Sequence, residues 1–182
     1  MRVFSWNCRG AVSQAFTRSL KEFCRVYKPD FVILQETRCS GDQALNAIRR
    51  LGFEFFHIKN AVGFSGGIWI LWKDPNLTVR IILSKTQFVH LEVWCNNQFN
   101  WLLTAVYASP QERLRRSSRE EMIEVAAIVN KEWLVVGDFN DIACMSEKKG
   151  GERTDARACI KFKEWINACG LIDLGFVGSK FT

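Results

Sequence analysis

The sequence contains few prolines and few histidines, and it lacks several patterns that would define a site or a linker. It has three prolines and two histidines in 182 residues, and its seven cysteines form no CxxC pair. The absence of a repeat, a low-complexity tract or a Pro/Gly/Ser linker predicts one domain over residues 1–182. The histidines are not spaced with the cysteines, which argues against structural zinc. An odd number of cysteines in mostly apolar surroundings is typical of free thiols in a reducing compartment.

Long apolar runs are absent as well. No stretch approaches the about 20 apolar residues that span a membrane. The opening "MRVFSWNCRG" lacks the apolar segment of a signal peptide. We therefore expect an intracellular protein with no membrane partner. The composition is 48% hydrophobic and 24% charged, which supplies a sizeable core. The net charge of +6 is compatible with a polyanionic partner, although many soluble proteins share it.

Hydrophobic periodicity predicts an alternation of strands and helices in the first third of the chain. A strand is expected over residues 2–8, and a helix follows with Phe16, Leu20 and Phe23 on one face. Proline cannot continue a helix, so Lys28-Pro29 ends it. "DFVILQET" is typical of a second strand, and "GDQALNAIRRLG" is typical of a helix closed by its last glycine.

The pattern then changes to short segments rich in Trp, Phe, Val and Ile. They are "FEFFHIKN", "GGIWILWK", "LTVRIILSK", "FVHLEVWC" and "FNWLLTAVYAS", and the short connectors between them predict an antiparallel meander or a set of hairpins. A helix over about 116–130, the strand "EWLVVGDF" and a helix over about 155–169 complete the pattern. Together these elements indicate an α/β layered fold of mostly antiparallel strands with helices outside.

Several of these strands end in polar residues that do not belong in a core. The residues are Asn7 and Arg9, then Gln35 and Glu36, then Tyr107, then Asp138 and Asn140. Each has an ordinary structural explanation: an Asn or Asp can serve a turn, and a tyrosine can be a half-buried sheet residue. If the strand ends converge, however, they bring together two carboxylates (Glu36 and Asp138), the carboxamides of Asn7 and Asn140, and the phenol of Tyr107.

Such a group of side chains suits phosphoester hydrolysis. Carboxylate and amide oxygens are hard ligands that favour Mg²⁺ or Mn²⁺. Asp138 could take a proton from water while Asn140 fixes its orientation, and Tyr107 and Asn7 could donate hydrogen bonds to phosphoryl oxygens. The sequence has no GxSxG motif and no Cys–His pair that would indicate a covalent nucleophile.

Two basic segments follow candidate site strands. They are "ERLRRSSRE" and "EKKGGERTDAR". Cations beside a phosphate site would hold a nucleic-acid backbone by charge. The alternative is a solvated helix start and a surface loop. The candidate nucleic-acid-binding residues are Arg9, Arg113, Arg115, Arg116, Lys148, Lys149 and Arg153.

The motifs "WNCRG", "LQET", "GGIWILW", "VYASP" and "VVGDFND", in this order, resemble the endonuclease/exonuclease/phosphatase superfamily, which includes apurinic/apyrimidinic endonucleases. "SEKKGG" and "LIDLGFVGSKFT" look most like the endonuclease domains of plant LINE-type (non-LTR) retrotransposons. The resemblance implies a two-sheet α/β sandwich flanked by helices and divalent-metal-dependent phosphodiester cleavage. It implies Glu36 and Asn7 at a Mg²⁺ or Mn²⁺ ion, Tyr107 facing the phosphate, and Asp138 and Asn140 orienting the attacking water.

The same resemblance implies DNA as the partner, with RNA as an alternative, and a nuclear location. It also implies a parent polyprotein with a reverse transcriptase domain that this chain does not contain. Two departures stand out. Arg9 stands where many members carry Asp or Asn, and the sequence stops at Thr182, before the family's Ser-Asp-His signature and its last strands. Neither His57 nor His90 replaces that histidine. We therefore expect weak or no activity in this form, and a non-catalytic retroelement remnant or a phosphatase or deadenylase of the superfamily remain alternatives.

Overall fold

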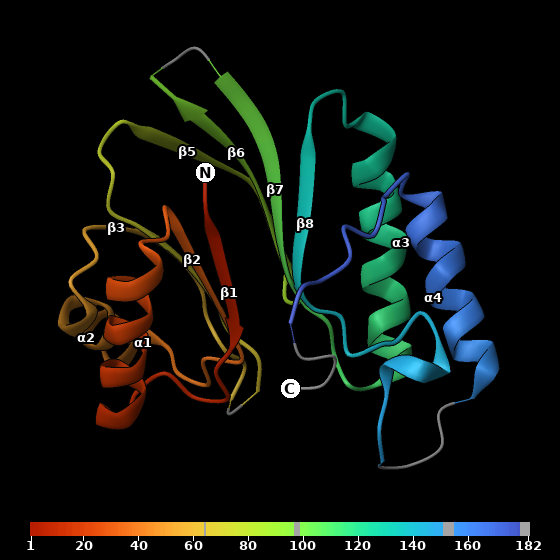
Figure 1. Ribbon diagram of the computed structural model, residues 1–182, viewed down its shortest axis with the longest axis horizontal. Helices are drawn as coiled ribbons and strands as arrows, with labels where there is room; N and C mark the ends of the chain where they lie inside the picture. Colours follow the sequence, from red (N-terminus) through yellow and green to blue (C-terminus); the bar gives the residue numbers. More distant parts are fainter. Residues whose placement is uncertain (64, 97–98, 151–154, 179–182) are drawn as a thin grey trace. The chain divides into compact units, whose positions relative to one another are not determined.

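The structure, a computed structural model, describes residues 1–63, 65–96, 99–150 and 155–178 (Figure 1). The chain divides into two compact units, which are described separately. The first comprises Met1–Ser109 with Lys131–Asp138, and the second comprises Pro110–Asn130 with Phe139–Thr182. None of the helices in these described ranges has the length and apolar character needed to span a bilayer.

The first unit contains two sheets, each with four strands among the described residues. One has the order β1 (Val3–Asn7), β2 (Phe31–Gln35), β4 (Ile68–Trp72), β3 (Phe55–Lys59). The other has the order β5 (Leu77–Ser84), β6 (Phe88–Cys95), β7 (Phe99–Tyr107), β8 (Trp133–Asp138). The β1–β2 and β7–β8 pairs are parallel and the others are antiparallel. The predicted α/β fold with mostly antiparallel pairing is confirmed.

The five predicted strands form a set of hairpins divided between the two sheets, and a single continuous meander is excluded. β4 lies between β2 and β3 in the first sheet, whereas β5, β6 and β7 form consecutive hairpins in the second. All five residues of β4, "IWILW", are buried. A continuously apolar strand is stable where both of its faces are covered, so it occupies the middle of a sheet.

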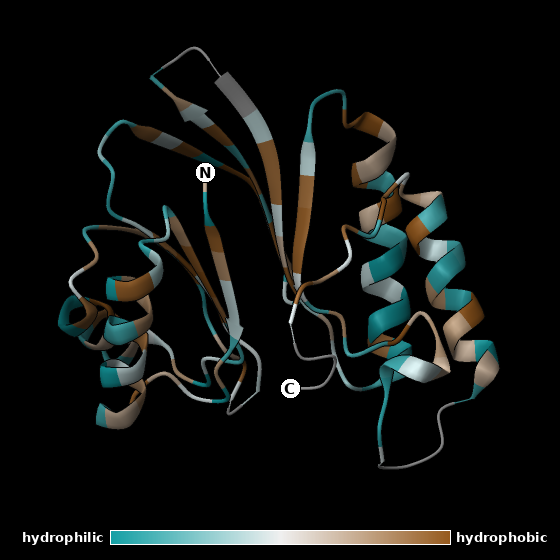
Figure 2. Cartoon of the chain, in the orientation of Figure 1, coloured by the Kyte–Doolittle hydropathy of each residue, from teal (hydrophilic) through white to brown (hydrophobic). Residues whose placement is uncertain are grey.

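Two apolar clusters hold the first unit together. Helices α1 (Gln14–Tyr27) and α2 (Gly41–Leu51) bury Leu20 and Ile48 against Val32 and Leu34 of β2. The alternate residues of the same strand, Phe31 and Ile33, join a second cluster with residues of β4 to β7. This alternation is the period of two that sends successive side chains to opposite faces of a strand. Figure 2 shows the strands of both sheets largely in the brown of hydrophobic residues.

The α1 boundaries follow the local signals of the sequence. The Ser13 hydroxyl accepts a hydrogen bond of 3.0 Å from the Phe16 amide, which satisfies a free N–H of the first turn. Lys28 ends the helix in a left-handed conformation directly before the proline, as predicted.

The second unit contains α3 (Glu112–Ile128), the short 3₁₀ helix η1 (Met145–Glu147) and α4 (Ala156–Ala168). α3 begins at Glu112, before the predicted start at 116, since "ERLRRS" consists mainly of good helix formers. Phe139 packs against Phe162 and Trp165 of α4, with ring centroids 5.7 Å away in both cases. Both Phe162 and Trp165 are buried.

Candidate functional site

The carboxyl ends of two parallel strand pairs lie at the candidate site. Asn7 is the register partner of Gln35, and Tyr107 is the register partner of Asp138. The Asn7 amide Nδ2 donates a hydrogen bond of 2.6 Å to Asp138 Oδ2, so β1 of one sheet is tied to β8 of the other. The structure thus brings Asn7, Tyr107 and Asp138 together from distant parts of the chain.

Glu36 follows β2 directly and is held by arginines. Its side chain is 13% exposed, and its φ of 55° lies in the left-handed region. Arg38 donates to Glu36 Oε1, with Nε 3.1 Å from that oxygen, and Nη2 makes a second, shorter contact. Arg9 Nε lies 4.0 Å from Glu36 Oε2. The carboxylate is therefore fixed and paired with positive charge.

Tyr107 is 7% exposed at the end of β7. Burial raises the pKa of its phenol above the ordinary value, and the nearby carboxylates of Glu36 and Asp138 raise it further. Tyr107 and Asp138 are register partners at the ends of β7 and β8. Tyr107 therefore keeps its proton at neutral pH and is available as a hydrogen-bond donor.

Asn7, Glu36, Tyr107 and Asp138 form the candidate centre. Two glycines next to it allow neighbouring backbone segments to approach closely. A Cβ on Gly67, whose φ is +90°, would lie 2.3 Å from the Thr37 hydroxyl oxygen, and a Cβ on Gly137 would lie 2.0 Å from the Val106 carbonyl oxygen. The Arg38 amide donates to the Gly66 carbonyl over 3.1 Å. Sequence reasoning missed the roles of Arg38 and of Gly66-Gly67, although the double glycine of "GGIWILW" was a visible signal.

Two other predicted strand-end residues lie differently. Gln35 is buried and its amide donates to the Ser5 hydroxyl over 2.7 Å, so it serves the packing of β1 on β2. Asn140 is exposed in the second unit with a φ of 46°. Its catalytic role stays a prediction.

The predicted nucleic-acid-binding residues have varied surroundings. Arg115 is 12% exposed and its Nε lies 3.0 Å from Asp141 Oδ2, and Arg119 contacts the same carboxylate. Arg116 is 81% exposed and pairs with Glu120. The remaining members are Arg9, Arg113, Lys148 and Lys149, which are exposed, and Arg153, which lies outside the described residues. Nucleic-acid contact by this set stays a prediction.

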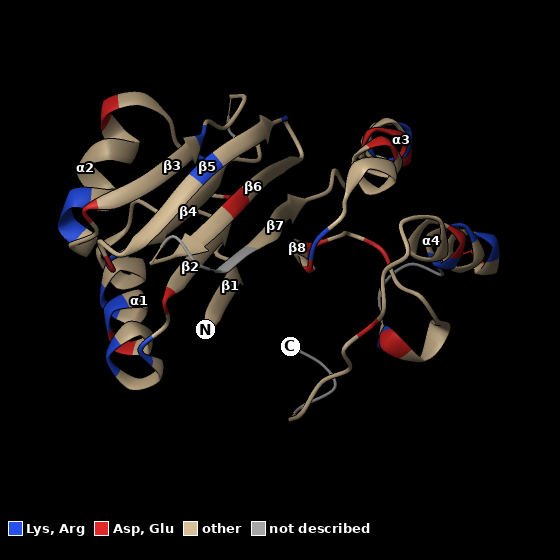
Figure 3. Ribbon diagram, turned by 90° about the horizontal axis from the view of Figure 1, so that it is seen from above, with Lys and Arg blue, Asp and Glu red and all other residues tan. Residues whose placement is uncertain are grey.

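Both histidines of the sequence belong to sheet strands, as expected. His57 on β3 contacts the Ser84 hydroxyl at 3.0 Å, and buried His90 on β6 contacts the Thr104 hydroxyl at 2.7 Å. Figure 3 shows one basic segment on β5 and one acidic segment on β6, which correspond to the ion pair of Arg80 and Glu92. None of these groups belongs to the centre around Asp138.

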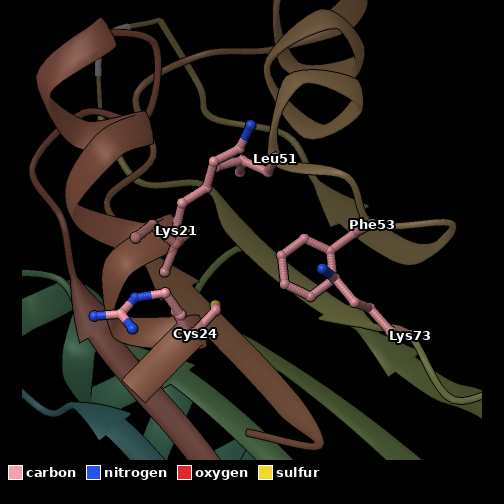
Figure 4. A pocket seen from close by; sticks show the side chains of 7 residues that line it. Lys21, Cys24, Leu51, Phe53 and Lys73 are labelled. Atoms are coloured by element: carbon pink, nitrogen blue, oxygen red, sulfur yellow. The ribbon is translucent and has the colours of Figure 1, made fainter. Parts of the chain in front are cut away.

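A hollow of about 240 Å³ lies in the first unit (Figure 4). It lies near the Phe31 end of β2, away from the end that carries Gln35 and Glu36. Lys21 and Cys24 of α1 line it together with Phe53 and Lys73, and the Lys73 ammonium lies 5.0 Å from the centroid of the Phe53 ring. Lys73 follows Trp72, which is in register with Phe31, whereas the centre lies at the Gln35 end of β2. The hollow is therefore separate from Asn7, Glu36, Tyr107 and Asp138.

The oxygen atoms at the centre fit a hard divalent cation. Asn7 Oδ1 is buried and has no hydrogen-bond partner within the described residues, while Nδ2 of the same amide is engaged by Asp138. Glu36 supplies a carboxylate at the adjacent strand end. Over the described ranges no three His, Cys, Asp or Glu side chains gather as a metal site. One or two protein oxygens, completed by water and phosphate, are the usual way in which Mg²⁺ is held, so the residues fit it.

The comparisons with known proteins agree with this fold. The chain belongs to the endonuclease/exonuclease/phosphatase family, whose model matches residues 4–176. The AP endonuclease LMAP from Leishmania major is similar in structure, with a TM-score of 0.70 and 15% identity, over 92% of this chain and 66% of that one. The endonuclease domain of TRAS1, a telomere-specific non-LTR retrotransposon, has a TM-score of 0.70 and 19% identity, over 97% and 75% of the two chains.

The human Nocturnin catalytic domain is a more distant structural neighbour. Its TM-score is 0.52 at 19% identity, over 77% of this chain and 64% of that one. The chain thus spans just under two thirds of the LMAP chain and of the Nocturnin domain. No curated protein sequence matches it. At these identities the neighbours define the fold, and the family match confirms the superfamily resemblance seen in the sequence.

Proposed function

We propose that this chain is a divalent-metal-dependent nuclease domain that hydrolyses phosphodiester bonds in DNA. The observation that carries the proposal is the Asn7 amide, which donates to Asp138 through Nδ2 and leaves Oδ1 buried without a partner among the described residues. Buried carbonyl oxygens are normally hydrogen-bonded, so an unsatisfied one beside carboxylates suggests a ligand site. Family membership supports the same reaction class.

The proposed roles follow from the chemistry of each side chain. Glu36 and Asn7 Oδ1 would hold Mg²⁺ or Mn²⁺, which when bound neutralises charge on the phosphate. Protonated Tyr107 donates a hydrogen bond to a phosphate oxygen. Asp138, held by Asn7, accepts a proton from the attacking water, with Asn140 orienting that water. Since neither histidine lies at the centre, no imidazole contributes, and we expect slow turnover by this chain.

A retrotransposon origin is the finer part of the proposal. It rests on the plant LINE-like segments "SEKKGG" and "LIDLGFVGSKFT". One structural neighbour, the TRAS1 domain, is also the endonuclease domain of a non-LTR retrotransposon. In that setting the chain would nick DNA in the nucleus beside a reverse transcriptase domain of the same polyprotein.

Nicking of supercoiled plasmid by the purified chain tests the proposal. We expect nicking with Mg²⁺ or Mn²⁺, its loss with EDTA, and its loss in Asp138→Ala. Asp42→Ala is the matched control, because it removes an exposed acidic residue in the first turn of α2, and it should nick as the parent does. Cleavage that survives EDTA would overturn the proposed metal dependence. Faster hydrolysis of poly(A) than of plasmid DNA would favour the deadenylase alternative, and faster hydrolysis of inositol phosphates would favour the phosphatase alternative.

A further inference from the structure

We propose that Arg38 is a phosphate-binding side chain that blocks Glu36 in the ligand-free protein, so that divalent-cation binding and phosphate binding at this centre are coupled. This inference rests on the proposed function and concerns the regulation of the same site. Arg38 would exchange one partner, the Glu36 carboxylate, for another, a phosphate oxygen.

The carboxylate is the fixed partner in this ion pair and the guanidinium is the exposed one. Glu36 is 13% exposed, whereas the Arg38 side chain is 44% exposed. Two nitrogens of Arg38 donate to the same oxygen, Oε1, with Nε at 3.1 Å. Any cation that binds through Oε1 must therefore displace Arg38.

The loop that carries both residues is anchored through its backbone. The Thr37 amide donates to Gly67 over 3.4 Å, the Arg38 amide donates to Gly66 over 3.1 Å, and the Thr37 carbonyl accepts from Ala11 over 3.0 Å. Thr37 is fully buried. Because the backbone is pinned on both sides, the exchange of partners needs only a rotation of the Arg38 side chain.

The chemistry of the guanidinium favours this exchange. Its planar fork matches two oxygens of a phosphate as well as two of a carboxylate. A cation on Glu36 leaves Arg38 without its partner, and a phosphate supplies a replacement. Whichever ligand binds first breaks the Arg38–Glu36 ion pair, so the second ligand does not have to break it. By linkage, each ligand raises the affinity for the other by the same factor.

Arg9 does not carry this coupling. It is 79% exposed, and its Nε is 4.0 Å from Glu36 Oε2, which is beyond hydrogen-bond distance. At that separation the solvent around the exposed Arg9 guanidinium largely screens its attraction to Glu36. We therefore expect Arg9→Gln to change cation affinity much less than Arg38→Gln does.

Mn²⁺ binding followed by electron paramagnetic resonance tests the proposal without any turnover. Dimethyl phosphate serves as the phosphodiester probe. Arg38→Gln should bind Mn²⁺ alone roughly three- to tenfold more tightly than the parent, since a partly exposed ion pair opposes binding. In the parent, dimethyl phosphate should tighten Mn²⁺ binding, and this gain should disappear in Arg38→Gln. Arg38→Lys keeps the charge but not the fork, so it should keep weak Mn²⁺ binding and lose most of the gain.

Arg25→Gln is the matched control. Arg25 makes a two-pronged ion pair with Glu22 on α1, at 2.9 and 2.7 Å, and has no role at the centre. It should match the parent in both measurements. Equal Mn²⁺ affinity in the parent and Arg38→Gln, with or without dimethyl phosphate, overturns the coupling and leaves the nuclease proposal standing. Absence of Mn²⁺ binding in every variant overturns the metal site itself and the coupling with it.

Discussion

Asn7 and Asp138 are separated by 131 residues in the sequence, yet the amide of the first donates to the carboxylate of the second over 2.6 Å. The bond joins the ends of β1 and β8, which belong to different sheets. A charge-assisted hydrogen bond in a partly buried position is stronger than a neutral one and fixes the direction of the carboxylate. One pair of side chains thus links the packing of the two sheets to the geometry of the candidate site.

Asn7→Ala should damage activity far more than stability. It removes the donor that orients Asp138 and the buried Oδ1 together. We expect the initial rate of plasmid nicking to fall by about 10²–10³, while the free energy of unfolding in urea falls by only about 1 kcal/mol. Asn46→Ala on the exposed face of α2 is the control and should change neither. A variant that nicks at the parent's rate would show that the Asn7–Asp138 bond is structural only.

Gly137→Ala should destabilise the first unit strongly. Its φ is +145°, and the added Cβ would lie 2.0 Å from the Val106 carbonyl oxygen, a backbone atom of the paired strand that cannot move aside. We expect a loss of roughly 3–5 kcal/mol in urea unfolding. Gly170→Ala, at a φ of +63° in open space, should cost only about 1 kcal/mol. Similar losses in both would mean that backbone conformation, and not the close approach of β8 to β7, makes Gly137 necessary.

The sequence predicts most elements of the fold because local patterns define them. The apolar face of α1 is buried at Phe16 and Leu20, and the helix ends at Lys28 as its proline requires. The family resemblance implied two sheets, but which of the five consecutive strands belongs to which sheet was not predictable. Strand periodicity says which residues are buried, but the choice of neighbour depends on long-range packing.

The candidate site shows the same limit. Asn7, Glu36, Tyr107 and Asp138 were visible because polar residues at the ends of apolar strands are unusual. The pairing of Arg38 with Glu36 was not visible, since it depends on left-handed backbone at both residues, with φ of 54° and 55°. Non-glycine residues rarely adopt that conformation, and no sequence pattern marks them.

Asp141→Asn should destabilise the second unit. Asp141 is 4% exposed and is the common partner of Arg115 and Arg119, which are 12% and 18% exposed. Removing one charge from a buried ion cluster leaves the others uncompensated, so we expect a loss of about 3–5 kcal/mol. Glu120→Gln breaks the exposed pair with Arg116 and should cost at most about 0.5 kcal/mol. Urea unfolding of both variants measures the difference, and equal costs would show that the Asp141 cluster is effectively solvated.

Acid should destabilise the protein through His90. Burial lowers the pKa of the imidazole below its ordinary 6.5, and the nearby Glu92 carboxylate only partly opposes this. The folded state therefore favours the neutral ring. Its contribution to stability is present above pH 6.5 and is lost as the pH falls through the folded-state pKa.

The free energy of unfolding should accordingly rise with pH up to the ordinary imidazole pKa of 6.5 and level off above it. His90→Gln, which keeps a polar partner for the Thr104 hydroxyl, should reduce that slope. Tryptophan fluorescence can follow the transition; Trp133 is one of the seven tryptophans, and its indole donates to the same hydroxyl over 2.7 Å. An unchanged slope in His90→Gln would assign the acid sensitivity to other groups.

The salt dependence of DNA binding should separate true phosphate contacts from structural arginines. Each phosphate contact adds about 0.9 to the slope of log affinity against log salt concentration. Arg113→Ala and Lys149→Ala, at exposed positions, should each lower the slope by about one while leaving the melting temperature unchanged. Arg115→Ala should instead lower the melting temperature, because Asp141 loses a partner. Arg49→Ala, an exposed basic residue in the last turn of α2, is the control. If its slope falls as much as those of Arg113→Ala and Lys149→Ala, the binding follows overall charge, and the basic segments form no particular nucleic-acid surface.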